Sequence, residues 1–334
     1  MPDNTPILWI RPADPEVYAK VTRQVDRLFD PGGHREALDL LESTWPGLPE
    51  TELHTSLIDI LTLKAYFQAQ INRPADALAT LEAMSRCGVS NSISSPAYDP
   101  IRGLSGYAEL AQENEALLTR ERTEAKVESD VYLPGDLRRD KAAPLMLVLH
   151  GDSGNLAKIR DAWPTGAIVS RGIIVAYVQS SQLRSTSRYV WMADPAVARA
   201  DVQAAFRDLC QRYPVDTSRV ILAGFSAGAT TALDLVFGQI VPAAGFIGLC
   251  TGDKPEHFTR ECVEAAKARG VRGVFFESEE NWPDEEEEEM LQTMREVGLP
   301  IELVIHQGVG HDVPLDFPEE MERALDFILG ELRA

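Results

Sequence analysis

The chain has 334 residues, with 32 lysines and arginines against 52 aspartates and glutamates, so its formal net charge is −20. Hydrophobic residues make up 44% and charged residues 25%, a composition typical of folded globular proteins and unlike disordered or collagen-like chains. The large negative charge repels phosphate backbones and anionic lipid surfaces. We therefore expect neither nucleic acid nor a membrane as a partner, and the length allows two domains.

The cysteines and the first residues of the sequence indicate in which cellular compartment the protein is expected. The four cysteines are scattered and form no CxxC pair, which favours reduced thiols over a disulfide framework or a zinc site. Residues 1–16 have no basic start, and Arg11 breaks their short apolar run, so they do not read as a signal peptide. The most apolar stretch, residues 221–249, contains Asp234 and Pro242 and is expected to be buried rather than membrane-spanning. These features predict a cytoplasmic protein with no metal site.

Residues 1–125 are expected to form a helical domain. Apolar residues recur at spacings of three and four around Leu38, and the same pattern returns around Leu78. Each segment follows a polar turn and an earlier helical segment, which predicts two helix–turn–helix hairpins. Residues 15–118 resemble tetratricopeptide repeats, a family whose surfaces bind peptides or proteins. The resemblance implies either a protein partner for this domain or a cover over an active site.

Residues 126–334 are expected to form a second domain, in which short apolar runs alternate with helical patterns. The expected strands cover residues 127–133, 145–149, 173–178, 220–225, 245–250, 271–276 and 301–305. The expected helices cover residues 194–212, 227–237, 257–269, 284–297 and 319–333. This alternation predicts an α/β fold with a doubly wound, mainly parallel sheet covered on both faces. Ligands of such sheets bind at the carboxyl ends of the strands.

The first chemical candidate is Ser226, in the sequence Gly224-Phe-Ser-Ala-Gly228. This G-x-S-x-G pattern lies between an expected strand and an expected helix, the context in which it forms a sharp turn that exposes a nucleophilic serine. The flanking glycines permit close approach of neighbouring backbone. Ser226 is therefore the predicted nucleophile.

A second group of candidates could stabilise a negatively charged oxygen. The apolar run that ends at His150 and Gly151 is an expected strand whose carboxyl end faces the same edge of the sheet. A tetrahedral intermediate needs two fixed N–H donors. We expect them to be the backbone amides of Ala227 and Asp152, with Gly151 as the alternative to Asp152. His150 itself is expected to be a structural hydrogen-bonding group.

The predicted general base is His311. It lies in the loop Gly308-Val-Gly-His-Asp-Val-Pro314, between the last expected strand and the last expected helix. A histidine that takes up and returns a proton needs such a position facing the cleft.

Residues 127–334 resemble the α/β-hydrolase family, on the strength of His150-Gly151, Gly224–Gly228 and Gly310-His311-Asp312. They are most similar to its esterase, lysophospholipase and dienelactone-hydrolase-like branches. The resemblance implies a Ser–acid–His triad in that chain order. It also implies hydrolysis of a carboxylic ester, a small-molecule substrate whose acyl-chain length stays open, through an acyl-enzyme and with no cofactor.

The acid of this triad is the least determined residue. In the family it follows the strand before the histidine strand, and Glu280 is our prediction there, with Asp284 and Asp253 as alternatives. A shifted alignment would place Asn281 at this position, and an asparagine supplies no charge. The acidic run 277–289 around these residues is interpreted as the solvated start of a helix, because carboxylates favour helix N-termini.

Candidate substrate contacts lie in the loop after the third expected strand, at Arg184, Arg188 and Trp191. Two alternatives to an esterase stay open. One is a thioesterase or peptidase with the same triad. The other is a weak or inactive hydrolase-fold protein that binds a partner through the helical domain.

Overall fold

The computed structural model describes residues 15–29, 32–48, 53–279, 285–314 and 316–330. The chain folds into two compact units. One comprises Met1–Glu124 together with Arg184–Ser187, and the other comprises Ala125–Leu183 and Arg188–Ala334. No helix in the described ranges is long and apolar enough to span a bilayer.

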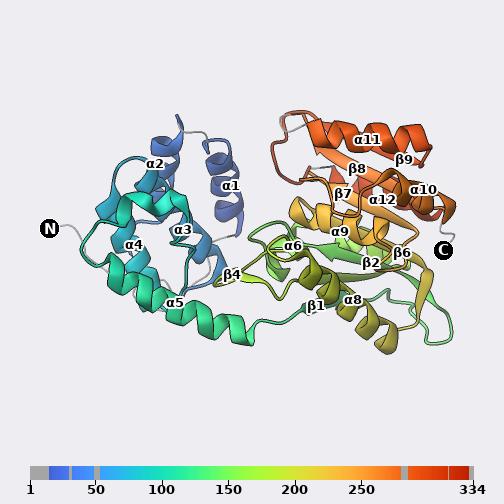
Figure 1. Cartoon of the computed structure of the whole chain (residues 1–334), viewed down its shortest axis with the longest axis horizontal. Coiled ribbons are helices and arrows are strands. Elements are labelled where there is room, and N and C mark those ends of the chain that lie inside the picture. The colour runs from blue at the N-terminus through green and yellow to red at the C-terminus, as the bar shows by residue number, and fades with distance from the viewer. Residues whose placement is uncertain (1–14, 30–31, 49–52, 280–284, 315, 331–334) are drawn as a thin grey trace. The chain divides into compact units, whose positions relative to one another are not determined.

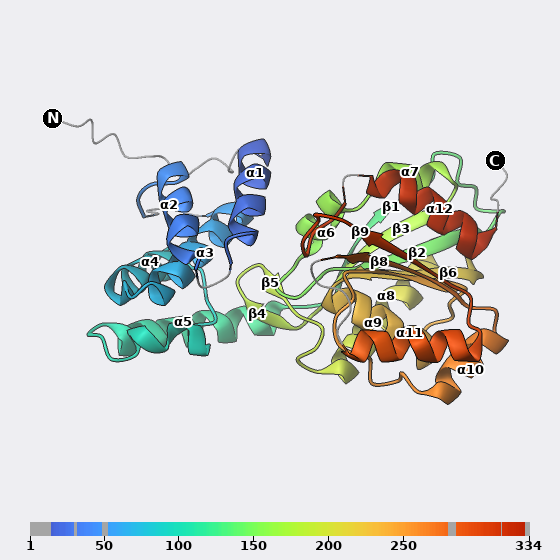
Figure 2. The same cartoon turned by 90° about the horizontal axis from the view of Figure 1, so that it is seen from above.

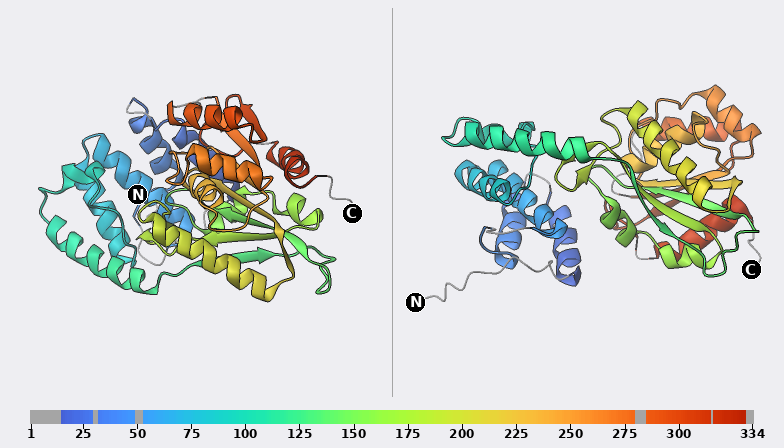
Figure 3. Two further views of the ribbon diagram at one scale, coloured as in Figure 1. Left: turned by 45° about the vertical axis from the view of Figure 1, so that its right-hand side comes forward. Right: turned by 90° about the horizontal axis from the view of Figure 1, so that it is seen from below.

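The first unit is helical. Its elements are α1 (Pro15–Asp26), α2 (His34–Thr44), α3 (Thr55–Gln70), α4 (Pro74–Arg86), the 3-10 helix η1 (Pro96–Ile101) and α5 (Tyr107–Glu124) (Figure 1). Helices adjacent in sequence pack on each other, and α5 lies alongside α4 (Figure 3). The two expected hairpins correspond to α1–α2 and α3–α4. Ala65, Ala69 and Ala77 are buried where α3 packs on α4, because small side chains allow two helices to approach closely. Kinship with tetratricopeptide repeats stays a prediction.

A short segment from later in the chain belongs to this helical unit. The strands β4 (Leu183–Ser185) and β5 (Arg188–Tyr189) form a two-stranded ribbon. At its turn, the Thr186 amide donates to Ser90 Oγ at 2.9 Å, and the Ser90 amide donates to Thr186 Oγ1 at 2.8 Å. Both hydroxyls also donate to the Glu121 carboxylate. Residues 184–187 were expected in the second domain. The hydrogen bonds between Ser90 and Thr186, which are 96 residues apart in the chain, place them with the helices instead.

The second unit is built on a seven-stranded sheet. Its strands are β1 (Glu128–Tyr132), β2 (Ala143–Leu149), β3 (Ile174–Gln179), β6 (Val215–Phe225), β7 (Gly245–Leu249), β8 (Arg272–Ser278) and β9 (Ile301–His306). Their order across the sheet is β1-β3-β2-β6-β7-β8-β9. All neighbours pair in parallel except β1, which is antiparallel to β3. The expected mixed α/β fold with a mainly parallel sheet is confirmed.

Helices cover both faces of this sheet (Figure 2). One face carries α8 (Pro195–Arg212), α9 (Ala227–Phe237), α10 (Arg260–Ala268) and α11 (Glu285–Val297), and the other carries α6 (Leu156–Ala162), α7 (Thr165–Ser170) and α12 (Phe317–Leu329). Along β2, Leu145 and Leu147 face the first set of helices, while Met146 and Val148 face the second. Because both faces are buried at the centre of the sheet, β2, β3 and β7 are buried along their whole length and are mostly apolar. The helices α6 and α7 were not expected, since six or seven residues show little periodicity.

The tight packing of the sheet at Gly273 yields a test of the fold. A Cβ atom built there would lie 2.1 Å from Cζ of the buried Phe246 ring. We expect Gly273→Ala to lower the free energy of unfolding by about 2 kcal/mol or more, because a buried ring cannot move aside without strain. Urea denaturation measures this. Gly166→Ala is the control, since no atom lies within 4 Å of its Cβ position, and a comparable loss in both variants would contradict the packing.

Candidate active site

Ser226 occupies a strained turn at the carboxyl end of β6. Its backbone angles are φ 54° and ψ −125°, and α9 begins at the next residue. Positive φ is costly for a residue with a Cβ atom and persists only where the surroundings enforce it. The Ser226 amide donates to Leu249 O at 2.9 Å, which ties the turn to the end of β7. Strand, turn and helix therefore follow one another as the sequence predicts.

Two glycines permit this turn. A Cβ atom at Gly224 would lie 2.4 Å from the carbonyl carbon of Gly228. A Cβ atom at Gly228 would lie 2.4 Å from His150 O and 2.5 Å from Leu149 O. The start of α9 thus packs directly against the end of β2, and no side chain fits between them. This contact brings the serine next to the segment expected to hold the oxyanion.

His150, at the end of β2, is a structural group as expected. Its Nε2 accepts a hydrogen bond from the Ser180 amide at 3.3 Å, so Nδ1 carries the proton and donates to Gly151 O at 2.7 Å. The Trp191 indole donates to His150 O at 2.9 Å and packs on the imidazole. Burial lowers the pKa of His150 to about 4, partly offset by the bond to Gly151 O. The ring is therefore neutral at pH 7 and fixes the shape of this loop.

The predicted oxyanion donors lie in this region. Ala227 is the first residue of α9, and the first N–H groups of a helix have no acceptor within it. The side chain of Asp152 is exposed. Gly151 packs so closely that a Cβ atom there would lie 2.7 Å from the Phe225 ring. The roles of Ala227, Asp152 and Gly151 stay predictions.

A cavity of about 250 Å³ opens beside the turn. It is lined by the loop that follows β2, by α6, by Phe225 and by the segment around His311; its apolar lining includes Ile159, Ala162 and Val313. Ser226 is not among the lining residues, but Phe225, which precedes it, is. The cavity therefore joins the expected oxyanion segment to the expected base.

His311 lies against the turn without bonding to the serine. Its imidazole centroid is 4.8 Å from that of Phe225, and no hydrogen bond joins it to Ser226 in the described parts of the chain. Loss of water around the ring lowers the pKa of His311, an effect that the negative charge of Asp312 opposes. A neutral imidazole can accept a proton. Catalytic hydrogen bonds are often long or unformed in ligand-free enzymes.

The predicted acid cannot be placed. Glu280 and Asp284 both lie outside the described residues. Asp253, in the loop after β7, is exposed, and none of the hydrogen bonds in the described ranges joins it to His311. The identity of the triad acid stays a prediction.

Sequence reasoning missed a buried glutamate close to this site. Glu277 is 3% exposed near the end of β8 and accepts a hydrogen bond from the Thr251 amide at 3.0 Å. Burial raises its pKa to about 8, and the nearby Glu287 adds to the shift. The expectation that residues 277–289 are solvated is wrong for these two glutamates, since Glu287 is buried as well. The signal was the continuity of the strand, because Glu277 follows Phe275 and Phe276 in a strand that is buried on both faces.

Cys250 links this glutamate to the loop that carries His311. It directly follows β7, has φ 47° and is buried. Its Sγ lies 3.8 Å from Asp312 O. Burial, with the negative charges of Glu277 and Asp312, raises its pKa to about 12, so the thiol stays protonated and supports the loop without acting as a nucleophile.

The expected substrate contacts do not line the cavity. Trp191 is 0% exposed, so its indole supports His150 and offers no surface to a substrate. Arg184 is exposed and belongs to the helical unit, whereas Arg188 is half-buried in β5. The position of these residues in a loop after a strand does not determine which of their side chains face the cavity.

Comparisons with known proteins support the fold. No protein-family model and no curated protein matches the sequence. An uncharacterized protein from Bacillus cereus ATCC 10987 is similar in structure, with 20% identity, 93% of this chain and 98% of that chain covered, and a TM-score of 0.51. The two chains thus share a fold over most of their lengths.

Two esterases are less similar in structure to this chain than the Bacillus cereus protein is. A thermophilic esterase from Thermogutta terrifontis has 16% identity, covering 60% of this chain and 86% of its own, with a TM-score of 0.43. Esterase PE8 has 19% identity, covering 61% and 99%, with a TM-score of 0.44. Likenesses at this level transfer no activity to the present chain.

The buried His150 predicts a loss of stability in acid. Its pKa is about 4 when folded and 6.5 when exposed, so between these values the unfolded chain binds a proton that the folded chain does not. We expect the free energy of unfolding to fall by about 3 kcal/mol from this residue as pH drops from 7 to 4. Denaturant titrations of wild type and His150→Asn test this. The variant should lack that part of the pH slope, the exposed-histidine control His54→Asn should keep it, and equal slopes in wild type and His150→Asn would contradict it.

The buried Glu277 predicts that the free energy of unfolding falls as the pH rises. The unfolded carboxyl ionises near pH 4.5 and the folded one near pH 8, so the wild type loses stability as pH rises between them. Glu277→Gln removes this loss, and its gain in unfolding free energy over wild type should grow by up to about 5 kcal/mol from pH 4.5 to 8. Thermal and urea unfolding at several pH values check this. The matched control is the exposed Glu279→Gln, and a gain that is flat with pH would refute the assignment.

Proposed function

We propose that this protein is a serine hydrolase that cleaves small carboxylic esters. The observation that carries the proposal is the positive φ of Ser226, held at the carboxyl end of a central strand beside a cavity that His311 lines. A strained serine at this position presents its hydroxyl to the cleft edge of the sheet. The resemblance of residues 127–334 to α/β-hydrolases agrees with this assignment.

The mechanism is two-step acyl transfer. Ser226 Oγ attacks the ester carbonyl while His311 takes its proton, and the imidazolium then protonates the departing alcohol. The amides of Ala227 and of Asp152 or Gly151 hold the developing oxyanion. A water molecule, activated by His311, releases the acid and regenerates the serine.

His311 must move for this reaction. Its ring, which contacts the ring of Phe225, must turn toward the neighbouring Ser226 when substrate binds. The lowered pKa keeps the imidazole neutral near pH 7, the form that accepts a proton. Glu280 is the proposed orienting acid, with Asp284 and Asp253 as alternatives.

The cavity limits the substrate. Its volume of about 250 Å³ is below the range of roughly 300–1,000 Å³ typical of sites for drug-sized ligands. The apolar side chains of Ile159, Ala162 and Val313 suit a short acyl group. Thioesters and peptide bonds react through the same groups and are the alternative substrates.

A non-catalytic role is the competing proposal. It is favoured by the lack of a Ser226–His311 hydrogen bond in the described structure and would assign the function to partner binding by the helical unit.

Hydrolysis of p-nitrophenyl esters separates the two. We expect wild type to cleave acetate and butyrate esters, and Ser226→Ala and His311→Ala each to lower kcat/KM by at least about 10³-fold, because the triad acts as a unit. The rate should rise with pH through an apparent pKa below 6.5, which reports deprotonation of His311.

Exposed-residue variants provide the controls. Ser170→Ala and His54→Ala should retain wild-type activity, since both residues are exposed and neither is among those that line the cavity. Full activity in Ser226→Ala would refute the proposal. No activity of wild type on any ester, thioester or peptide would favour the binding role.

A further inference from the structure

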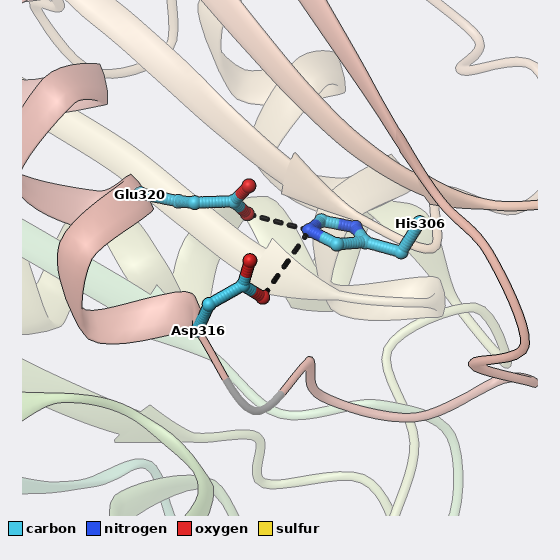
Figure 4. Close-up of side chains that lie close together, drawn as sticks. All are labelled: His306, Asp316 and Glu320. Carbon is cyan, nitrogen blue, oxygen red and sulfur yellow. Dashed lines mark hydrogen bonds and ion pairs between the residues drawn. The ribbon is translucent and has the colours of Figure 1, made fainter.

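Three side chains outside the candidate active site converge on one point (Figure 4). His306, the last residue of β9, places Nε2 2.5 Å from Glu320 Oε2 and 3.9 Å from Asp316 Oδ1. One nitrogen and two carboxylate oxygens thus lie within 4.8 Å of one another. His306 and Glu320 are 9% and 6% exposed, whereas the Asp316 side chain is 65% exposed. The cluster therefore has a buried floor and an open side.

A fourth polar group lies next to this floor. Ser278 is 2% exposed, and its Oγ has no hydrogen-bond partner among the residues that the structure describes. It pairs directly with His306 in the parallel β8–β9 ladder, so the two side chains project from the same face of the sheet. Phe276, two residues earlier on that face, also packs beside the imidazole. A buried hydroxyl without a partner is costly and indicates a missing ligand or water.

The charges around the cluster are not balanced. Asp316 and Glu320 bring two negative charges together, one of them buried. Arg323 Nη2 lies 3.4 Å from Glu320 Oε1, but the arginine is 73% exposed, so solvent screens its charge. With a neutral His306, the form that binds a metal, the two carboxylates leave the cluster with a net negative charge even beside Arg323. A divalent cation would neutralise it.

The geometry points to a zinc-type divalent metal site formed by His306, Asp316 and Glu320. Imidazole and carboxylate ligands bind zinc at 2.0–2.2 Å, so in a tetrahedral site two ligand atoms lie about 3.4 Å apart. The observed separations of 2.5 and 3.9 Å bracket that value, and side-chain shifts of about 1 Å would accommodate the ion. Three protein ligands leave a fourth position for water, which would give the Ser278 hydroxyl a partner.

The position of this site suggests its role. His306 ends β9 and Asp316 immediately precedes α12, so the ligands bracket the chain that carries His311. A metal would join the two ends of that segment and restrict where His311 can move. The role inferred for the metal is to anchor this segment, and the inference does not rest on the proposed esterase activity.

Metal binding by the full-length protein tests this inference. After removal of metals with a chelator, isothermal titration with Zn²⁺ should show one saturable site per chain. Asp316→Asn and Glu320→Gln should each weaken the affinity at least about tenfold, and His306→Ala should abolish binding. Co²⁺ should give the visible absorption of a tetrahedral ion in wild type but not in His306→Ala.

The controls separate this site from others. Glu322→Gln, an exposed glutamate on the same helix, and Ser226→Ala should bind Zn²⁺ as wild type does. Because Asp316 is exposed, Asp316→Asn keeps the test valid even if His306→Ala fails to fold. No saturable binding in wild type, or unchanged affinity in Asp316→Asn and Glu320→Gln, would overturn the inference.

Discussion

The close contact between the start of α9 and the end of β2 is the constraint on which the candidate site depends. Gly228 leaves no room for a Cβ atom against His150 O, and Gly224 leaves none against Gly228. This contact sets the path of the chain through Ser226 and thereby its positive φ. It also fixes the serine relative to the loop after β2. Without it, the predicted nucleophile Ser226 would not be fixed relative to Gly151 and Asp152, the predicted oxyanion donors on that loop.

Three buried titratable groups near the candidate site stay largely uncharged. His150 is neutral because burial disfavours the imidazolium and its two hydrogen bonds fix one tautomer. Cys250 remains a thiol, and Glu277 tends to remain protonated. These three groups therefore add little charge next to the candidate site. This arrangement leaves His311, at the cleft, as the group free to exchange protons.

Much of the fold could be predicted because the signals were local. The strand β2 and the second half of β6, residues 220–225, are unbroken apolar runs, and α9 has the bounds expected from its pattern. The turn at Ser226 followed from five residues. His150 was correctly interpreted as structural because a histidine that ends a buried strand has little access to solvent. In each of these cases, sequence neighbours determine the outcome.

The remaining features depend on contacts between distant residues. No local sequence pattern indicates the antiparallel pairing of β1, the contact of Thr186 with the helical unit or the burial of Trp191. The pairing of His306 with Glu320 joins a strand to a helix, and the spacing of these residues in the sequence matches no known motif that would predict it. Composition could not reveal that two glutamates of an acidic run turn inward.

Reaction with a fluorophosphonate probe, followed by peptide mapping, tests the central claim most directly. The probe forms a stable adduct only with an activated serine. We predict a single adduct on Ser226 in wild type, none in Ser226→Ala, and strongly reduced labelling in His311→Ala. Absence of labelling in folded wild-type protein across the pH range, or an adduct on another serine, would contradict the claim that this strained turn carries a catalytic nucleophile.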